Sequence, residues 1–131
     1  MRKKSLTSIK LSRKIAQFAS DKKAIDISIL EMRRLVNFCD FFVICSGNTE
    51  RQVKAIADYM EDEVKNMGIQ VTTAPSVKTN TWVIFDAGDV VVHIFQKQAR
   101  EFYNLEYLWQ EAKRVKWEDA TLKGQETKDK V

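Results

Sequence analysis

Few residues of this chain have side chains and spacings that could support catalysis. His93 is the only histidine, and it lies within the apolar segment VVVHIFQ. A nucleophilic triad needs a base beside a serine or cysteine and a third group that orients the base. The sequence contains no serine-centred turn of that kind. We therefore predict that His93 is a hydrogen-bonded strand residue rather than a catalytic base.

The carboxylates form no recognisable catalytic pair. Asp86 and Asp89 are three residues apart and flank a predicted turn, whereas two-metal sites place carboxylates on one face of a strand. We interpret these two residues as turn residues or as acidic contacts for a partner. Glu101 and Glu106 lie on different faces of a predicted helix, so they do not form a general acid–base pair.

Metal and phosphate sites are not expected either. Cys39 and Cys45 are the only cysteines, and together with one histidine they supply too few ligands for zinc. Both lie in apolar surroundings, which favours buried free thiols over a disulfide. Neither glycine-rich phosphate motif occurs, and Ser46-Gly47 is only a weak indication of an anion site. The sequence predicts no catalytic residue, no metal site and no cofactor.

Composition indicates one globular domain. The chain has 131 residues, of which 44% are hydrophobic and 31% are charged, with four glycines and one proline. These values exclude disordered, collagen-like and low-complexity proteins. No apolar segment approaches the roughly 18 to 20 residues that cross a bilayer, and the basic N-terminus is followed by no signal-peptide pattern. We expect a cytoplasmic protein without a membrane partner.

The net charge of +4 comes from the two ends of the chain. Residues 1–14 hold six basic and no acidic residues, whereas residues 15–112 hold ten basic and fourteen acidic residues. We expect residues 1–10 to form a basic flexible tail, residues 11–117 a single domain, and residues 118–131 a flexible polar tail. A basic tail can contact phosphate and add salt-dependent affinity, although a solvated end is the more frequent outcome.

Hydrophobic periodicity predicts helices that alternate with strands. Thr49 and Gln52 fit a capping box at the start of the most secure helix, and Gly68 is placed to end it. Asn104 is expected to cap the last helix. Helices are predicted from residue 7 or 8 to about 23, from 49 to 68, and after 97; strands at 24–31, 41–45, 69–73, 81–85 and 90–95; and an exposed loop at 75–80. This order favours an α/β fold with a mixed, about five-stranded sheet flanked by helices.

Large apolar side chains are predicted on both faces of the 81–85 strand. Trp82, Ile84 and Asp86 share one face, whereas Val83 and Phe85 share the other. If helices pack on one face only, an apolar patch stays exposed on the other, and such patches mark protein interfaces. For any single residue, a place in the core is an equal alternative. Further aromatic residues follow in the last helical segment, at Phe102, Tyr103, Tyr107 and Trp109.

Three segments resemble the signature blocks of one protein family. They are CDFFVICSGNTERQVKAIAD at residues 39–58, WVIFDAGDVVVHIFQ at 82–96 and REFYNLEYLW at 100–109. Together they resemble the ribosomal silencing factor family, also called the Iojap or DUF143 family, over about residues 11–117. The resemblance implies a nucleotidyltransferase-like fold without the catalytic carboxylates, and therefore a protein that is not an enzyme. The resemblance does not decide whether the protein forms a homodimer.

The resemblance also implies a partner. It predicts binding of the large ribosomal subunit at ribosomal protein fourteen, a steric block to joining of the small subunit when nutrients are short, and a minor rRNA contact through the basic tail. A nucleotide-binding or nucleotidyl-transfer enzyme with the same fold is the alternative. The expected ribosomal-protein contacts are Trp82, Ile84, Asp86, Asp89, Arg100, Glu101, Tyr103, Leu105 and Glu106.

Overall fold

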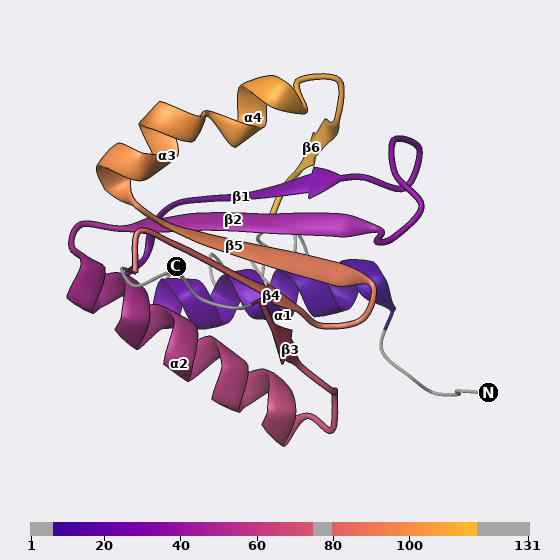
Figure 1. The fold of residues 1–131 in the computed structure, drawn as a ribbon. Helices are drawn as coiled ribbons and strands as arrows, with labels where there is room; N and C mark the ends of the chain where they lie inside the picture. Colours follow the sequence, from indigo (N-terminus) through magenta and orange to yellow (C-terminus); the bar gives the residue numbers. More distant parts are fainter. Residues whose placement is uncertain (1–6, 75–79, 118–131) are drawn as a thin grey trace, which may run out of the picture.

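The computed structural model describes residues 7–74 and 80–117. The tails expected at residues 1–10 and 118–131 and the loop expected at 75–80 lie largely outside the described residues. Helices and strands alternate along the described part of the chain (Figure 1). They are α1 (Ser8–Asp21), β1 (Ile25–Glu31), β2 (Phe41–Gly47), α2 (Glu50–Asn66), β3 (Thr72–Thr73), β4 (Trp82–Asp86), β5 (Val90–Gln96), α3 (Lys97–Tyr103), α4 (Leu105–Leu108) and β6 (Lys113–Val115).

The strands of the described residues form one mixed sheet of six, in the order β3-β4-β5-β2-β1-β6. β2 and β5 are parallel neighbours near its centre, and every other neighbouring pair is antiparallel. The mixed sheet flanked by helices confirms the predicted fold class, but the expected strand count of about five was too low. The additional strand is β6, whose three residues pair with β1. A strand this short has no readable period in a single sequence.

The two ends of α2 have the capping features that the sequence predicts. Thr49 Oγ1 accepts a hydrogen bond from the Gln52 backbone N–H at 3.1 Å, and Gln52 Oε1 accepts one from the Asn48 N–H at 2.7 Å. The first bond satisfies an N–H group that a helix start leaves without a partner, and the second is made to Asn48, one residue before the N-cap Thr49. Gly68 follows α2 with φ of +84°, a left-handed conformation that glycine adopts without steric cost. Both ends of the predicted helix are therefore confirmed.

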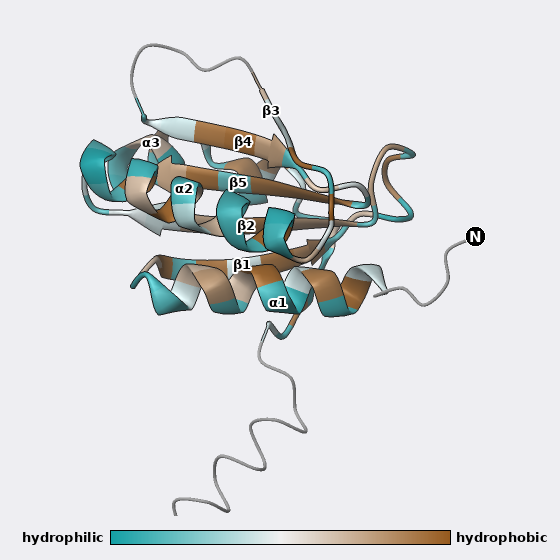
Figure 2. Ribbon diagram, turned by 90° about the horizontal axis from the view of Figure 1, so that it is seen from below, coloured by the Kyte–Doolittle hydropathy of each residue, from teal (hydrophilic) through white to brown (hydrophobic). Residues whose placement is uncertain are grey.

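α1 and α2 lie together on one face of the sheet and bury the larger core (Figure 1). Ile15 of α1 and Ile56 and Met60 of α2 are fully buried there, against Phe85 of β4. β2 is buried along its whole length, which confirms the prediction of a strand covered on both faces. β4 and β5 are also hydrophobic along most of their length (Figure 2), so the sheet has an apolar second face.

Three predicted elements differ from the structure. In β1 the polar–apolar alternation holds only at the start of the strand. A bulge, in which Asp26 has a φ of +52°, interrupts the pairing with β2. After the bulge, Ser28, Ile29 and Leu30 are all buried. The strand predicted at 69–73 is reduced to the two exposed residues of β3. The last helix is broken at Asn104, whose φ of +49° is left-handed and whose side chain makes no cap hydrogen bond.

Candidate functional site

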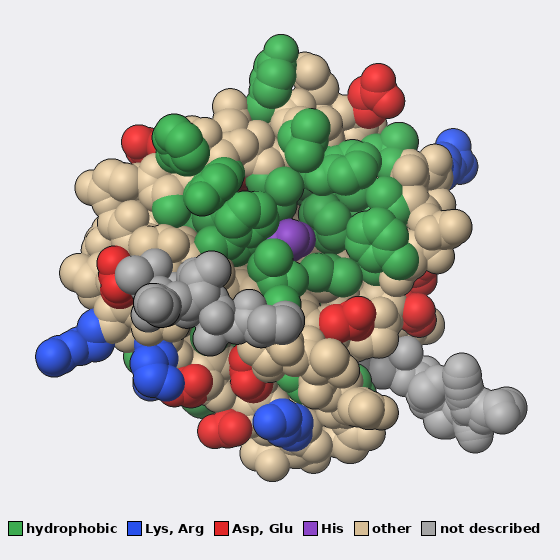
Figure 3. Space-filling view, in the orientation of Figure 1, with side chains coloured by type: hydrophobic (Ala, Val, Ile, Leu, Met, Phe, Trp, Pro, Cys, Tyr) green, Lys and Arg blue, Asp and Glu red, His purple; other side chains and the backbone are tan. Residues whose placement is uncertain are grey.

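The second face of the sheet carries an aromatic surface that α3 and α4 cover only in part. Figure 3 shows hydrophobic side chains gathered around the single histidine, with acidic side chains at the border of the patch. Strand pairing explains the cluster, because residues that face each other on neighbouring strands point to the same side of a sheet. We call this surface the aromatic face. Its residues are Phe42, Trp82, Ile84, His93, Phe95, Tyr103 and Trp109.

Trp82 lies at the centre of the ring contacts in this face. It pairs with Phe95 across β4 and β5, and their ring centroids are 4.8 Å apart in a stacked arrangement. The ring of Tyr103, from the end of α3, lies 4.7 Å from that of Trp82. Trp82 and Ile84 are half-buried, and Tyr103 is 50% exposed. The indole is thus held in place from two sides while part of it stays open to a partner.

His93 lies on β5 at the middle of the aromatic face. Its Nδ1 accepts a hydrogen bond from Trp82 Nε1–H at 3.2 Å, which confirms the prediction of a hydrogen-bonded strand histidine. The side chain is only 5% exposed. Burial lowers the pKa of His93 to about 4, because an apolar environment disfavours the charged imidazolium. His93 is therefore neutral near pH 7.

Exposed apolar side chains extend this surface beyond the sheet. Phe38, in the loop between β1 and β2, is 58% exposed and lies 6.4 Å from the Phe42 ring. On α3 and α4, Phe102 is 80% exposed and Leu108 is 68% exposed. A contiguous apolar surface of this kind is typical of a protein-binding site.

Two acidic residues lie at the end of the β4–β5 hairpin. Asp86 Oδ1 accepts a hydrogen bond from the Gly88 N–H at 2.9 Å, and Gly88 has a φ of +79°. The Asp89 carbonyl accepts hydrogen bonds from the N–H groups of Asp40 and Phe41, at 2.7 and 3.3 Å. The prediction that these aspartates are turn residues is confirmed. Both side chains are exposed, so their charges are also available to a partner.

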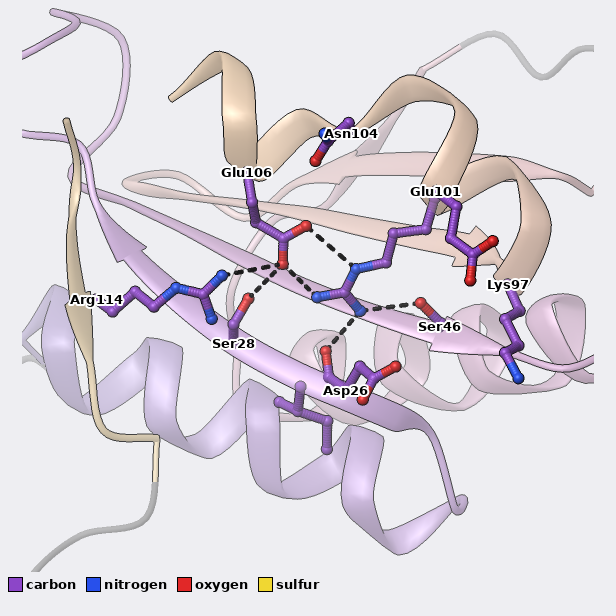
Figure 4. Close-up of a pocket in the computed structure, with 10 residues that line it drawn as sticks. Asp26, Ser28, Ser46, Lys97, Glu101, Asn104, Glu106 and Arg114 are labelled. Carbon is purple, nitrogen blue, oxygen red and sulfur yellow. Dashed lines mark hydrogen bonds and ion pairs between the residues drawn. The ribbon is translucent and has the colours of Figure 1, made fainter. Parts of the chain in front are cut away.

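A polar pocket of about 450 Å³ lies between α3–α4 and the strands β1 and β2 (Figure 4). The Arg100 guanidinium points into it and ion-pairs with the Glu106 carboxylate, while its Nη1 donates to Ser46 Oγ at 2.9 Å. Ser28 Oγ donates to Glu106 at 3.3 Å, and Arg114 lies 3.7 Å from the same carboxylate. Burial alone would raise the pKa of Glu106, but its hydrogen bonds and the two guanidinium charges lower it.

The structure thus divides the predicted contact residues into two groups. Trp82, Ile84 and Tyr103 come together in the aromatic face, whereas Glu101 is exposed and lines the polar pocket. Arg100 and Glu106 also face that pocket, with only 12% and 16% of their side chains exposed. Leu105 is 7% exposed and belongs to the core beneath α4. These last three residues hold α3 and α4 on the sheet.

Three members of the aromatic face were not identified from the sequence. Phe42 lies on β2, and His93 and Phe95 lie on β5, where nearly continuous apolar runs hide which residues point to which face. The signal that could have found them is the alternation of side chains along each strand. Val91, His93 and Phe95 are two residues apart, as are Trp82 and Ile84, so each set shares a face.

Other candidate chemistry is sparse in the described residues. Within residues 7–74 and 80–117, no three His, Cys, Asp or Glu side chains come together as a possible metal site. Cys39 and Cys45 are buried free thiols, as predicted. Burial raises the pKa of Cys39 to about 11 and that of Cys45 to about 12. Among the helices in the same ranges, none is long and apolar enough to span a membrane.

Sequence comparison relates the chain to one protein family. The chain matches the family model described as "Ribosomal silencing factor during starvation" over residues 5–131. It is 46% identical over 100 residues to Ribosomal silencing factor RsfS of Bacillus subtilis, which covers 76% of this chain and 85% of that protein. It is 44% identical over 92 residues to Protein Iojap, chloroplastic, of Zea mays, which covers 70% of this chain and 40% of that protein.

Two crystal structures are similar to the fold described above. A protein from Chromobacterium violaceum superimposes with a TM-score of 0.73 at 31% identity, covering 79% of this chain and 88% of that chain. A protein from Bacillus halodurans superimposes with a TM-score of 0.68 at 39% identity, covering 79% of this chain and 94% of that chain. The sheet and its flanking helices are therefore shared with experimentally solved proteins.

Proposed function

The chain belongs to the ribosomal silencing factor family, and from that premise we propose that it binds the large ribosomal subunit at ribosomal protein fourteen. In this proposal the bound protein sterically blocks joining of the small subunit and so represses translation when nutrients are short. It acts by occupying a surface and catalyses no reaction. We place it in the cytoplasm, with the ribosomes that it silences.

The observation that carries the proposal is the aromatic face. Trp82 is stacked on Phe95 and packed against Tyr103, yet it stays partly exposed. Binding energy concentrates in aromatic side chains that are held rigid before a partner arrives, because little conformational entropy is then lost on binding. The exposed apolar residues around this cluster would exclude water from its edge. This arrangement suits a protein partner better than a small polar ligand.

Charge at the border of the face supports a basic protein as the partner. Asp86 and Asp89 are exposed at the hairpin, and Asp86 ends β4, the strand that carries Trp82 and Ile84 of the face. Acidic side chains around an apolar centre raise the rate of association with a positively charged surface and disfavour acidic partners. Ribosomal proteins are basic because they bind RNA, so this charge pattern fits ribosomal protein fourteen.

The basic residues at the N-terminus suggest a second, weaker contact. Residues 1–10 contain Arg2, Lys3, Lys4 and Lys10 and no acidic residue. We propose that they contact rRNA phosphates without reading sequence. Deletion of residues 1–6 should weaken binding modestly and reduce its salt dependence. An unchanged dependence on salt would argue against this contact.

The main test is binding of the full-length protein to purified ribosomal subunits. We expect it to co-sediment with large subunits and not with small ones, and to slow the joining of the two when it is added before mixing. Asp62→Asn, an exposed change on α2, is the matched control and should behave as wild type. Association with small subunits alone would overturn the proposal, as would binding to large subunits without any effect on joining.

Two alternatives are separated by parallel measurements. A nucleotide-binding or nucleotidyl-transfer enzyme would show a nucleotide- and Mg²⁺-dependent rise in melting temperature, which we do not expect. A second copy of the chain could instead cover the aromatic face. Sedimentation velocity of the protein alone detects such a dimer, and Trp82→Ala should then dissociate it.

A further inference from the structure

His93 is a polar side chain set into an apolar surface. On β5 it lies opposite Ile84 of β4 and Ile44 of β2. The Phe42 ring lies 4.6 Å from the imidazole, and the Phe95 ring stacks parallel to it at 6.3 Å. Figure 3 shows part of the histidine at the surface, surrounded by hydrophobic side chains. No charged partner from these neighbouring strands contacts the ring.

The hydrogen bond from Trp82 determines which nitrogen carries the imidazole proton. An indole N–H can only donate, so His93 Nδ1, at 3.2 Å from Trp82 Nε1, must accept through its lone pair. A neutral imidazole has one protonated nitrogen. The proton of His93 is therefore on Nε2, and Nε2–H is a hydrogen-bond donor.

This donor has no partner in the free protein. Nε2 is buried and makes no hydrogen bond within the described part of the chain. A buried donor without an acceptor destabilises the folded protein, and such groups are rare in native structures. The surrounding residues do not require histidine here, since a leucine or phenylalanine would suit an apolar strand position. The unpartnered N–H therefore calls for an acceptor that the unbound protein does not supply.

We propose that His93 Nε2–H donates a hydrogen bond to an oxygen of the bound partner, which makes His93 a specificity-determining residue at the centre of the interface. The inference rests on the proposed function and adds a chemical requirement to it. The partner must bring an acceptor, either a backbone carbonyl or a side-chain oxygen, into the middle of its apolar contact. A partner that presents a lysine or another donor there would leave two donors facing each other and would be rejected.

The position of the ring makes this contact reachable. Part of His93 lies at the surface within the patch, and its buried Nε2 is reached when neighbouring side chains move. Trp82 and Ile84 on one side are only half-buried and can adjust as the partner packs on them. Once covered, the new hydrogen bond would be shielded from water, which strengthens its contribution to selectivity.

Two substitutions separate the roles of the two ring nitrogens. His93→Asn keeps an acceptor oxygen where Nδ1 stands and removes the Nε2–H donor. His93→Gln places an amide N–H near the position of Nε2 and removes the acceptor for Trp82. The indole Nε1–H resonance of Trp82, assigned with Trp82→Phe, reports its hydrogen bond in each variant. Affinity for purified large subunits reports the partner contact.

We expect His93→Asn to keep the Trp82 resonance near its wild-type position and to weaken binding by about tenfold, the size of one lost hydrogen bond. His93→Gln should shift the Trp82 resonance and retain more affinity than His93→Asn. Equal affinity of wild type and His93→Asn would overturn the inference and leave the proposed function intact. So would weaker binding by His93→Gln than by His93→Asn, since His93 would then serve only to position Trp82. Failure of the wild-type protein to bind large subunits would overturn both.

Discussion

Arg100 and Glu106 form an ion pair across Asn104, the left-handed residue that joins α3 to α4. Arg100 Nε donates to Glu106 Oε1 at 3.3 Å, and a second guanidinium nitrogen contacts the other carboxylate oxygen. Arg100 Nη1 also donates to the Asp26 carbonyl, at the bulge of β1. The pair therefore ties the turn between α3 and α4 to the sheet. Tyr103 directly precedes this turn, so the same bonds hold its ring against Trp82.

Breaking this ion pair should destabilise the fold. Glu106→Leu leaves the Arg100 charge partly buried without its partner, and we expect a loss of about 3 kcal/mol in the free energy of unfolding. The double variant Arg100→Met/Glu106→Leu should regain part of that loss. Urea denaturation of Glu106→Leu, of Arg100→Met and of the double variant measures the coupling. Strictly additive effects would show that the two residues act independently.

Trp82→Ala should reduce binding more than it reduces stability. The indole is half-buried and anchors the aromatic face, so we expect a loss of about 2 kcal/mol or more in binding of large subunits. Phe85→Ala is the matched control, because Phe85 lies on the same strand, points to the other face and is fully buried. It should cost roughly 3 to 5 kcal/mol of stability. A comparable loss of stability in Trp82→Ala would assign Trp82 to the core.

Asp86→Asn and Asp89→Asn should leave the fold intact and weaken binding through charge. An asparagine at position 86 keeps the side-chain oxygen that accepts from the Gly88 N–H, so the melting temperature should stay near that of wild type. The double variant should bind large subunits more weakly and with a smaller dependence on salt. Asp62→Asn on α2 is the control for loss of charge alone. An unchanged salt dependence in the double variant would place the aspartates outside the interface.

Acid should destabilise the protein through His93. Burial lowers the pKa of His93 from 6.5 to about 4, so between these values the unfolded chain binds a proton that the folded protein does not. Stability therefore falls as pH falls through this window and is unaffected by His93 above it, with a total effect of about 3 kcal/mol. Urea denaturation at pH 7 and pH 4.5 should show a larger loss in wild type than in His93→Asn. Equal losses would mean that His93 titrates normally.

Local patterns in the sequence predicted most of the elements that frame the site. The α2 helix was predictable because Thr49 and Gln52 begin it and Gly68 ends it, and each signal acts within four residues. The β4–β5 hairpin was predictable for the same reason, with Gly88 at the turn. The C-terminal segment was less well predicted. Asn104 was expected to cap a single last helix, but it ends α3 and begins α4 in a left-handed conformation, where the bonds from Arg100 to Glu106 and Asp26 hold the break.

The sequence alone determined the fold class, the absence of any recognisable catalytic or phosphate-binding motif, and two members of the aromatic face on β4, Trp82 and Ile84. These features depend on residue type and on spacings of two to four residues, which a single sequence displays directly. Only the tertiary structure decided that Phe42, which lies 40 residues before Trp82 in the chain, joins the same face. It also decided that Arg100 faces Glu106 and that Trp82 donates to His93. Those contacts follow from strand register and from the turn at Asn104, which arise when distant segments pack against each other.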